Sequence, residues 1–320
     1  MKTRSLHRLL RRLPVTLFCA LPLLFACAPS GAAADVPSAV QAKPNLATAV
    51  PTATPVATPL VTPTPSPSPT PYIGPPEGYE LRFFDEFDAE EIDEAQWGFE
   101  IGPWPYNNEL ECYTRDNAWT EDGALVVEAR LEPSADCDYT SARLTTQGQF
   151  DFTYGYLEVR AALPTGRGTW SAIWMLPTDQ RYGGYLQSGE IDIAERVGYD
   201  AKRVHSTIHT YLNNSVNDSA ITAYSRLTRK DDGFHTYGML WTENEIKITI
   251  DGVEALLYPK PESATSDSWP FDVPFHLILN LAVGGSWGGA KGVDPEAFPQ
   301  RMYVDYVRYY ALPGEAPEAP

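Results

Sequence analysis

Gly189-Glu190-Ile191-Asp192-Ile193-Ala194-Glu195 carries three carboxylates within six residues, separated by apolar side chains. Isoleucine is β-branched and favours extended backbone, so the stretch predicts a strand rather than a helix. Because side chains alternate along a strand, Glu190 and Asp192 share one face, while Ile191 and Ile193 point into a core. A regular strand would send Glu195 to the opposite face, and one extra residue, a β-bulge, returns it. The prediction is a half-buried strand with three acids in a row on its outer face.

Three carboxylates in a row suit acid–base chemistry. Like charges held close together raise the pKa of at least one carboxyl, which keeps its proton near neutral pH while a neighbour stays ionised. Retaining glycoside hydrolysis uses this division: one carboxylate attacks the anomeric carbon, and the other protonates the leaving oxygen and then activates water. Spacing alone leaves two alternatives open, a solvated acidic strand face and a calcium site, because calcium prefers carboxylate oxygens.

Strand-like runs recur at short spacing elsewhere in the chain. They are Ala124–Leu131, Gly155–Leu163, Ile246–Asp251, Phe275–Val283 and Tyr303–Ala311. Asp251-Gly252 lies between two such runs and predicts a type I′ β-hairpin. No long segment shows helical periodicity and no internal repeat is evident, so many short strands with turn signals predict an all-β sandwich.

The three acids, followed by Arg196-Val197-Gly198, resemble the signature of glycoside hydrolase family 16 in its bulged, laminarinase-like form. Further blocks look similar and occur in the family's order from about residue 80 to 311: Asp85-Glu86-Phe87-Asp88, Asn107-Asn108-Glu109-Leu110, Tyr139-Thr140-Ser141-Ala142-Arg143, Tyr154-Gly155-Tyr156, Trp170-Ser171-Ala172-Ile173-Trp174-Met175-Leu176-Pro177, His205-Ser206-Thr207-Ile208-His209, Phe234-His235-Thr236-Tyr237, Leu279-Asn280-Leu281-Ala282-Val283-Gly284-Gly285 and Met302-Tyr303-Val304-Asp305-Tyr306-Val307-Arg308. The resemblance implies an all-β fold, a β-jelly-roll sandwich of two antiparallel sheets with a concave substrate cleft.

The same resemblance implies an exported, endo-acting glycoside hydrolase. It would cleave β-1,3-glucan of the laminarin type with retention, through a covalent glycosyl-enzyme intermediate. Mixed-linkage β-1,3-1,4-glucan is the nearest alternative substrate, and sulfated galactans would call for a more basic cleft. A non-catalytic, lectin-like glucan-binding module is the alternative from another functional class. A transglycosylase, which passes the glycosyl group to a sugar instead of water, is a further alternative between the hydrolase and the binding module.

Roles for four residues follow from the resemblance. Glu190 is the nucleophile and Glu195 the acid/base, while Asp192 between them tunes their protonation. His209 shares a strand face with His205 by the two-residue period, and the family places such a histidine beside the acids. The alternative for His209 is a buried structural role.

Substrate contacts are expected from aromatic and polar residues. Eight Trp and eighteen Tyr give the chain many faces on which sugar rings can stack. The expected substrate-binding residues are Trp104, Asn107, Arg143, Trp170, Trp174, His209 and Trp287. Trp170 and Trp174 have core packing as an alternative, and Arg143 has support of the site from behind. Glu111 and Cys112 depart from the family, which often has Gln and an aromatic residue there.

Two further sites are expected, one of them a structural calcium. Family members commonly bind calcium on the convex face, and Glu86, Gly123 and Asp305 match that site, with waters completing the shell. No zinc pattern and no phosphate-binding glycine loop is present, so no cofactor is expected for catalysis.

Cys112 and Cys137 are expected to form a disulfide that stabilises the fold by about 3.5 kcal/mol on the chain-entropy model.

Residues 1–34 read as a signal or lipoprotein leader. Basic residues run to Arg12, and an apolar stretch of about fourteen residues follows, which is short for a membrane span. Leu24-Phe25-Ala26-Cys27 resembles a lipobox, so Cys27 is the expected lipidation site and membrane tether. Ordinary cleavage near Ala32-Ala33-Ala34 is the alternative. Either route exports the protein, as a cell-surface lipoprotein or in secreted form.

Residues 35–76 read as a linker, because twelve prolines fall between Pro37 and Pro76. Residues 77–313 are the expected glycoside hydrolase β-jelly-roll domain, and 314–320 a tail. The net charge of −18 would repel phosphates, which argues against nucleic-acid partners and suits a neutral polysaccharide. One domain on a long linker is expected to be a monomer.

Overall fold

The computed structural model describes residues 74–104, 106–227 and 233–314. The expected leader, the lipidation site Cys27, most of the linker and residues 315–320 of the tail lie outside these ranges. Within them, no helix has both the length and the apolar character that a membrane crossing requires.

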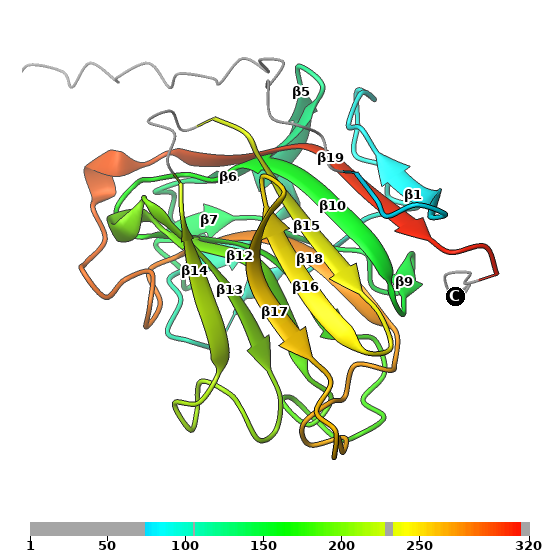
Figure 1. Cartoon of the computed structure of the whole chain (residues 1–320). Coiled ribbons are helices and arrows are strands. Elements are labelled where there is room, and N and C mark those ends of the chain that lie inside the picture. Colours follow the sequence, from blue (N-terminus) through cyan, green and yellow to red (C-terminus); the bar gives the residue numbers. More distant parts are fainter. Residues whose placement is uncertain (1–73, 105, 228–232, 315–320) are drawn as a thin grey trace, which may run out of the picture. The chain divides into compact units, whose positions relative to one another are not determined.

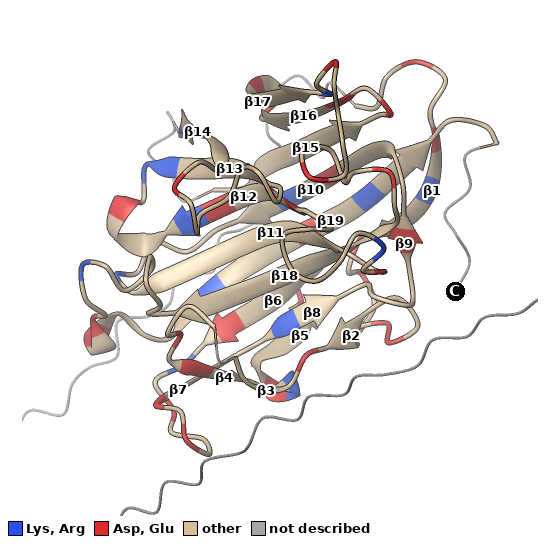
Figure 2. Ribbon diagram, turned by 90° about the horizontal axis from the view of Figure 1, so that it is seen from below, with Lys and Arg blue, Asp and Glu red and all other residues tan. Residues whose placement is uncertain are grey.

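Two antiparallel sheets of eight strands each form the described domain (Figure 1). Sheet A has the order β17 (Val253–Pro259), β16 (Glu245–Ile250), β15 (His235–Trp241), β10 (Gly155–Ala162), β19 (Gln300–Ala311), β6 (Ala124–Ala129) and β5 (Ala118–Glu121), with β1 (Glu80–Asp85) also paired to β19. Sheet B has the order β14 (Ile221–Arg226), β13 (Arg203–His209), β12 (Glu190–Val197), β11 (Thr169–Pro177), β18 (Phe275–Val283), β8 (Arg143–Thr145) and β2 (Gly98–Phe99), with β9 (Asp151–Phe152) also paired to β18. Figure 2 shows β13, β12, β11, β18 and β8 side by side in this order.

Smaller elements complete the described chain. A third sheet joins β3 (Gly102–Pro103), β4 (Glu111–Tyr113) and β7 (Tyr139–Ser141). Three short 3-10 turns are η1 (Arg115–Asn117), η2 (Gly198–Asp200) and η3 (Pro295–Ala297). The all-β sandwich predicted from the sequence is confirmed.

The core lies between the two sheets. Ile191 and Ile193 of β12 are fully buried in one apolar cluster with Val159 of β10 and Val304 of β19. Full burial of such a side chain contributes about 1.5–3 kcal/mol, so the apolar half of β12 strongly favours this orientation. The inward direction of these isoleucines fixes the opposite face of β12 as the one that carries its acids.

The predicted hairpin at Asp251-Gly252 joins β16 to β17. Both residues have positive φ, 50° and 74°, as a type I′ turn requires. The predicted strand runs also match β6, β10, β16, β18 and β19, with ends that differ by a few residues.

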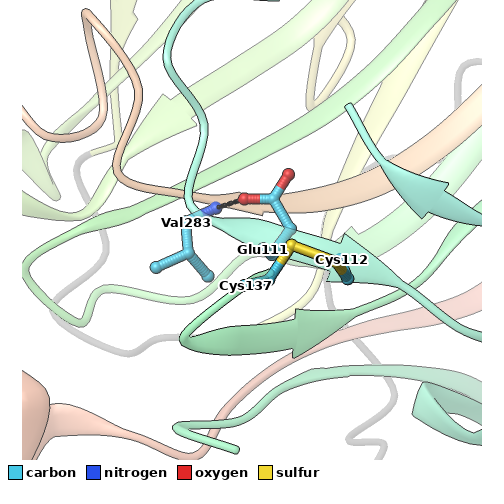
Figure 3. Close-up of a disulfide and its surroundings, with 4 residues drawn as sticks. All are labelled: Glu111, Cys112, Cys137 and Val283. Atoms are coloured by element: carbon cyan, nitrogen blue, oxygen red, sulfur yellow. Dashed lines mark hydrogen bonds between the residues drawn. A yellow bond between two sulfur atoms is a disulfide. The ribbon is translucent and has the colours of Figure 1, made fainter. Parts of the chain in front are cut away.

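A disulfide joins Cys112 of β4 to Cys137, which lies in the segment before β7 (Figure 3). β4 and β7 also pair in parallel, with Cys112 opposite Thr140. The bond and the pairing together fix the small sheet, and the neighbouring residue Glu111 bonds to β18.

Candidate active site

A β-bulge in β12 sets the positions of its three acids. On the β13 side, Glu190 pairs with His209, Asp192 with Thr207 and Glu195 with His205, so three steps along β12 match two along β13. The bulge predicted from the spacing is present. The two residues between Asp192 and Glu195 are both fully buried in the core. The side chains of Glu190, Asp192 and Glu195 therefore share the outer face of sheet B, which we call the acid face.

Gly189 precedes this strand in a conformation that other residues rarely adopt. Its φ is +84°, and a Cβ atom there would lie 2.8 Å from both Phe271 Cε1 and Pro270 Cγ. Glycine alone meets both conditions without strain, so the residue before Glu190 helps to set where the acid face begins.

His209 lies against two of the acids. Its Nε2 atom is 3.1 Å from Asp192 Oδ2 and 3.7 Å from Glu190 Oε1, and all three residues are buried. Each of the three offers a ligand atom within 4.8 Å of the others, which also makes them a metal-capable cluster. The position beside the acids is the one expected for His209, and it lets the imidazole hold these carboxyls in place.

Glu195 is held from the neighbouring strand. Trp170 of β11 donates its indole N–H to Glu195 Oε1 at 2.9 Å. The Trp170 ring lies edge-on to Trp287 at 5.5 Å, and Trp287 lies edge-on to His205 at 4.9 Å between ring centroids. Trp170 and Trp287 therefore come together at the Glu195 end of the acid face, and Trp170 contacts the carboxyl directly.

Burial makes all three acids hold their protons more tightly than in water. It raises the pKa of Glu190 well above the ordinary value, and the charge of Asp192 raises it further. Burial raises the pKa of Asp192 to about 8. Burial, followed by the Asp192 charge, raises the pKa of Glu195 to about 8. The three carboxyls cannot all be ionised at neutral pH, so the acid face keeps protons available for transfer.

Arg143 of β8 lies between two of the expected tryptophans. Its guanidinium carbon is 4.1 Å from the Trp104 ring centroid and 4.7 Å from that of Trp174. Its Nε atom is 2.6 Å from Glu100 Oε2, and the side chain is buried. The guanidinium thus contacts both rings while Glu100 holds it in place, and both roles expected for Arg143 stay predictions.

Asn107 lies on the loop before β4 and is exposed. Its Nδ2 atom donates to Glu109 Oε1 at 3.1 Å, and its carbonyl oxygen accepts from the Ser286 amide at 2.7 Å. These bonds connect the Asn107 loop to the loop that carries Trp287. Asn107 therefore lies beside the loop that carries Trp287, while Trp104 lies beside Arg143 of β8.

Several residues near the site carried no signal in the sequence. Burial, followed by the charges of Glu190 and Asp192, raises the pKa of the Tyr185 hydroxyl, which lies in the turn that precedes Gly189. Asn280 of β18 accepts from Trp174 Nε1 at 2.8 Å and donates to the Tyr113 hydroxyl at 3.0 Å. The two Asn280 contacts join residues far apart in the chain, and only the strand pairing brings them together.

The expected calcium ligands have other partners in the structure. Arg308 donates to both carboxylate oxygens of Glu86 at 2.7 Å, and Arg160 pairs with Asp305 at 2.5 Å. Asp88 is the acid beside Gly123, with its Oδ1 atom 3.3 Å from the place where a Cβ on Gly123 would stand. A calcium ion held by these carboxylates would therefore compete with Arg308 for Glu86 and with Arg160 for Asp305.

Comparison with known proteins gives two overlapping family matches. The model for glycosyl hydrolases family 16 matches residues 107–308. The model for beta-glucan synthesis-associated protein SKN1/KRE6/Sbg1 matches residues 4–192, and so ends within β12.

Individual relatives share most of the described domain. A beta-glucanase of Rhodothermus marinus is 46% identical over 245 residues, which are 72% of this chain and 85% of the relative. The X-ray structure of the laminarinase from Rhodothermus marinus has a TM-score of 0.70, covering 72% of this chain and 97% of that one. A mutant of SCLam, a non-specific endo-beta-1,3(4)-glucanase with 1,3-beta-D-cellobiosyl-glucose at its active site, is 40% identical, with a TM-score of 0.70 over 74% of this chain and 96% of that one. Glucan endo-1,3-beta-glucosidase A1 of Niallia circulans is longer, and this chain covers 38% of it at 35% identity.

Proposed function

This chain belongs to glycosyl hydrolase family 16 and is a glycoside hydrolase, and on that premise we propose that it is an exported, endo-acting and retaining enzyme that cleaves β-1,3-glucan of the laminarin type. The observation that carries the proposal is the acid face, where the buried Glu190 and Asp192 and the half-buried Glu195, all with raised pKa values, lie on one bulged strand beside His209 and Trp170. The glucans named for the similar proteins give the substrate class.

The first step forms a glycosyl-enzyme ester. A Glu190 oxygen attacks the anomeric carbon, and the bond from that carbon to the glycosidic oxygen breaks. Glu195 gives its proton to the departing oxygen, so the leaving sugar departs as a neutral hydroxyl. Glu190 must be ionised for this step, and we assign the proton of the Glu190–Asp192 pair to Asp192, which His209 contacts at 3.1 Å.

The second step releases the product. Glu195, now ionised, takes a proton from water while the water oxygen attacks the anomeric carbon. The ester bond to Glu190 breaks, and both carboxyls return to their starting protonation. Trp170 steadies Glu195 in both steps, because its N–H can donate to the carboxyl whether or not a proton is present.

Trp170→Phe tests this assignment through the pH profile. The indole N–H favours the ionised form of Glu195 and lowers its pKa, so its loss should raise that pKa above about 8. The alkaline limb of kcat/KM, which reports the free enzyme, should move up by about one pH unit. Trp287→Phe removes a neighbouring indole without removing this bond and serves as the control. Equal limbs in the wild type and in Trp170→Phe would contradict the assignment.

Substrate class is tested by reducing-end release from laminarin, mixed-linkage glucan, curdlan and agarose, beside a Glu190→Ala control. Release from laminarin that is lost in the control supports the proposal. Release from mixed-linkage glucan alone would keep the proposed chemistry and change the substrate specificity. This is the second candidate function, because the similar protein SCLam is a non-specific endo-beta-1,3(4)-glucanase. Laminarin binding without release of product from any substrate would instead indicate a lectin-like module. Transfer products in the same digests would reveal transglycosylation.

Export rests on the N-terminal sequence, where the lipobox-like stretch ends at Cys27. We propose that lipid on Cys27 holds the enzyme at the cell surface. Incorporation of labelled fatty acid into the wild type and not into Cys27→Ser would support the tether. Incorporation into neither protein would leave ordinary cleavage and secretion as the route.

We also propose a structural calcium ion, which would compete with two arginines for the carboxylates expected to bind it. An ion bound by the Glu86 and Asp305 side chains would have to displace Arg308 and Arg160. If calcium is bound, EDTA should lower the unfolding temperature and added calcium should restore it, because a ligand that binds only the folded state stabilises it. An unchanged unfolding temperature would count against a calcium site.

A further inference from the structure

Glu190, Asp192 and His209 have the composition of a metal site as well as that of a catalytic one. Each side chain offers one ligand atom, and the three atoms lie within 4.8 Å of one another. In the part of the chain that the structure describes, no other group of three acidic, histidine or cysteine side chains comes together in this way. Zinc is commonly held by three protein ligands drawn from histidine and carboxylate, with a water in the fourth position. The cluster therefore supplies the ligand set of an open zinc site.

The distances inside the cluster fit tetrahedral coordination. His209 Nε2 lies 3.1 Å from Asp192 Oδ2 and 3.7 Å from Glu190 Oε1. Zinc bonds of about 2.0–2.1 Å to nitrogen and oxygen place two ligand atoms of a tetrahedron about 3.3 Å apart. Both measured distances are within a few tenths of an ångström of that spacing, so small side-chain rotations would let one ion contact the imidazole and the carboxylates together.

Asp192 directs an oxygen without a partner into this cluster. The residue is 3% exposed, and its Oδ2 atom is buried with no hydrogen bond from any described residue. The 3.1 Å approach of His209 Nε2 does not have hydrogen-bond geometry, so it leaves this oxygen unsatisfied. Buried polar atoms without a partner are rare in folded proteins and unfavourable. A cation bound to Oδ2 would provide the missing partner.

His209 determines which class of ion fits the cluster. Magnesium and calcium prefer shells made of oxygen ligands, whereas an imidazole nitrogen suits zinc, copper and nickel. The spacing of the acids by itself left a calcium site open, but the histidine beside them favours zinc. Glu195 lies outside the cluster, and its carboxyl accepts from Trp170 instead.

The second nitrogen of His209 limits the affinity of the site. A ligating histidine usually donates its other ring N–H to an acceptor, and loss of that acceptor costs about 10–100-fold in metal affinity. His209 Nδ1 is buried and has no hydrogen-bond partner within residues 74–104, 106–227 and 233–314. Reversible binding with a Kd on the order of micromolar is therefore expected, rather than permanent incorporation of the ion.

We propose that Glu190, Asp192 and His209 form an inhibitory zinc site, in which one reversibly bound ion coordinates the nucleophile and blocks its attack on the sugar. A Glu190 oxygen bound to zinc has its lone pair engaged and is not free to bond to the anomeric carbon. The inhibitory part rests on the proposed function, whereas zinc binding does not. Such a site would make hydrolysis depend on the free zinc around the enzyme.

Calorimetric titration with zinc tests binding without any need for activity. The protein must lack a polyhistidine tag, because such a tag binds zinc itself. The wild type should bind one ion at the cluster. His209→Gln should weaken this binding by about 100-fold or more, because a direct ligand contributes at least as much as an outer partner. Glu190→Gln should weaken it as well, and it decides the matter alone if His209→Gln does not fold.

His205→Gln is the matched control. It removes an imidazole from the same strand, β13, at a position outside the cluster. Its zinc affinity should equal that of the wild type. Absence of zinc binding in the wild type would overturn the site. An affinity that is unchanged in Glu190→Gln, or that falls equally in His205→Gln and His209→Gln, would place the ion elsewhere and overturn it too.

Inhibition is measured on laminarin at concentrations well below KM, where the rate reports the free enzyme. The zinc concentration that halves the rate should equal the calorimetric Kd, and excess EDTA should restore the rate. Magnesium at the same concentration should leave the rate unchanged. Zinc bound at the cluster without loss of rate would overturn the inhibitory role. A wild type that hydrolyses no glucan would contradict the proposed function instead, and the calorimetric result would still stand.

Discussion

Glu190→Gln is expected to lower kcat on laminarin by about 10⁵-fold, the scale of losing a catalytic nucleophile. The amide has nearly the shape of the carboxyl and keeps its place opposite His209, but it cannot form the glycosyl ester. The measurement is reducing-end release over long incubations, with laminarin binding followed separately by calorimetry. Retained binding with lost turnover is the expected pair of results.

The fold of Glu190→Gln provides the control. Burial raises the pKa of Glu190, so an ionised carboxylate at this position is disfavoured in the folded state. An uncharged amide should therefore keep or raise the unfolding temperature at neutral pH. A variant that folds normally and still hydrolyses laminarin at more than a few per cent of the wild-type rate would show that another group attacks the sugar.

Glu195→Gln is expected to lower kcat on laminarin by about 10³-fold, within the range for a general acid–base group. The loss should be much smaller for the first step on an aryl glycoside with a good leaving group, because that departure needs little protonation. Pre-steady-state release of the phenol measures this step by itself. Equal losses on laminarin and on the aryl glycoside would contradict the acid role.

Added azide gives a second reading of Glu195→Gln. Azide is a small nucleophile that attacks the glycosyl ester without a base, so it should restore turnover and give a glycosyl azide of retained configuration. Glu190→Gln should show no such product, because it forms no ester. The two variants therefore separate the nucleophile from the acid/base.

Local pattern was enough to predict the fold and the row of acids. Two isoleucines alternating with acids determine which side of β12 is buried, and the extra residue before Glu195 calls for a bulge. Neither conclusion depends on a distant part of the chain. The same alternation put His209 on one strand face with His205, and the family resemblance implied that His209 lies beside the acids.

The supporting contacts could not be predicted because they cross between strands far apart in sequence. Glu111 bonds to Val283 across 172 positions, and Trp174 bonds to Asn280 across 106. Whether Trp170 stacks on sugar or holds Glu195, and whether Arg143 faces substrate or lies behind tryptophans, depends on strand neighbours that no local pattern specifies. The sequence around the expected calcium ligands Glu86 and Asp305 likewise did not indicate that arginines would form ion pairs with them.

The bulge in β12 also affects which changes of gene length this enzyme can tolerate. Loss of the codon for Ala194 would leave Glu190, Asp192 and Glu195 at alternate positions of a regular strand, still on one face. Loss of the codon for Ile191 would instead turn Glu190 towards the core, because every residue before the gap would change sides. Deletions that survive in descendants of this gene should therefore concentrate at residues 193 and 194, where the strand already holds one residue more than its neighbour needs.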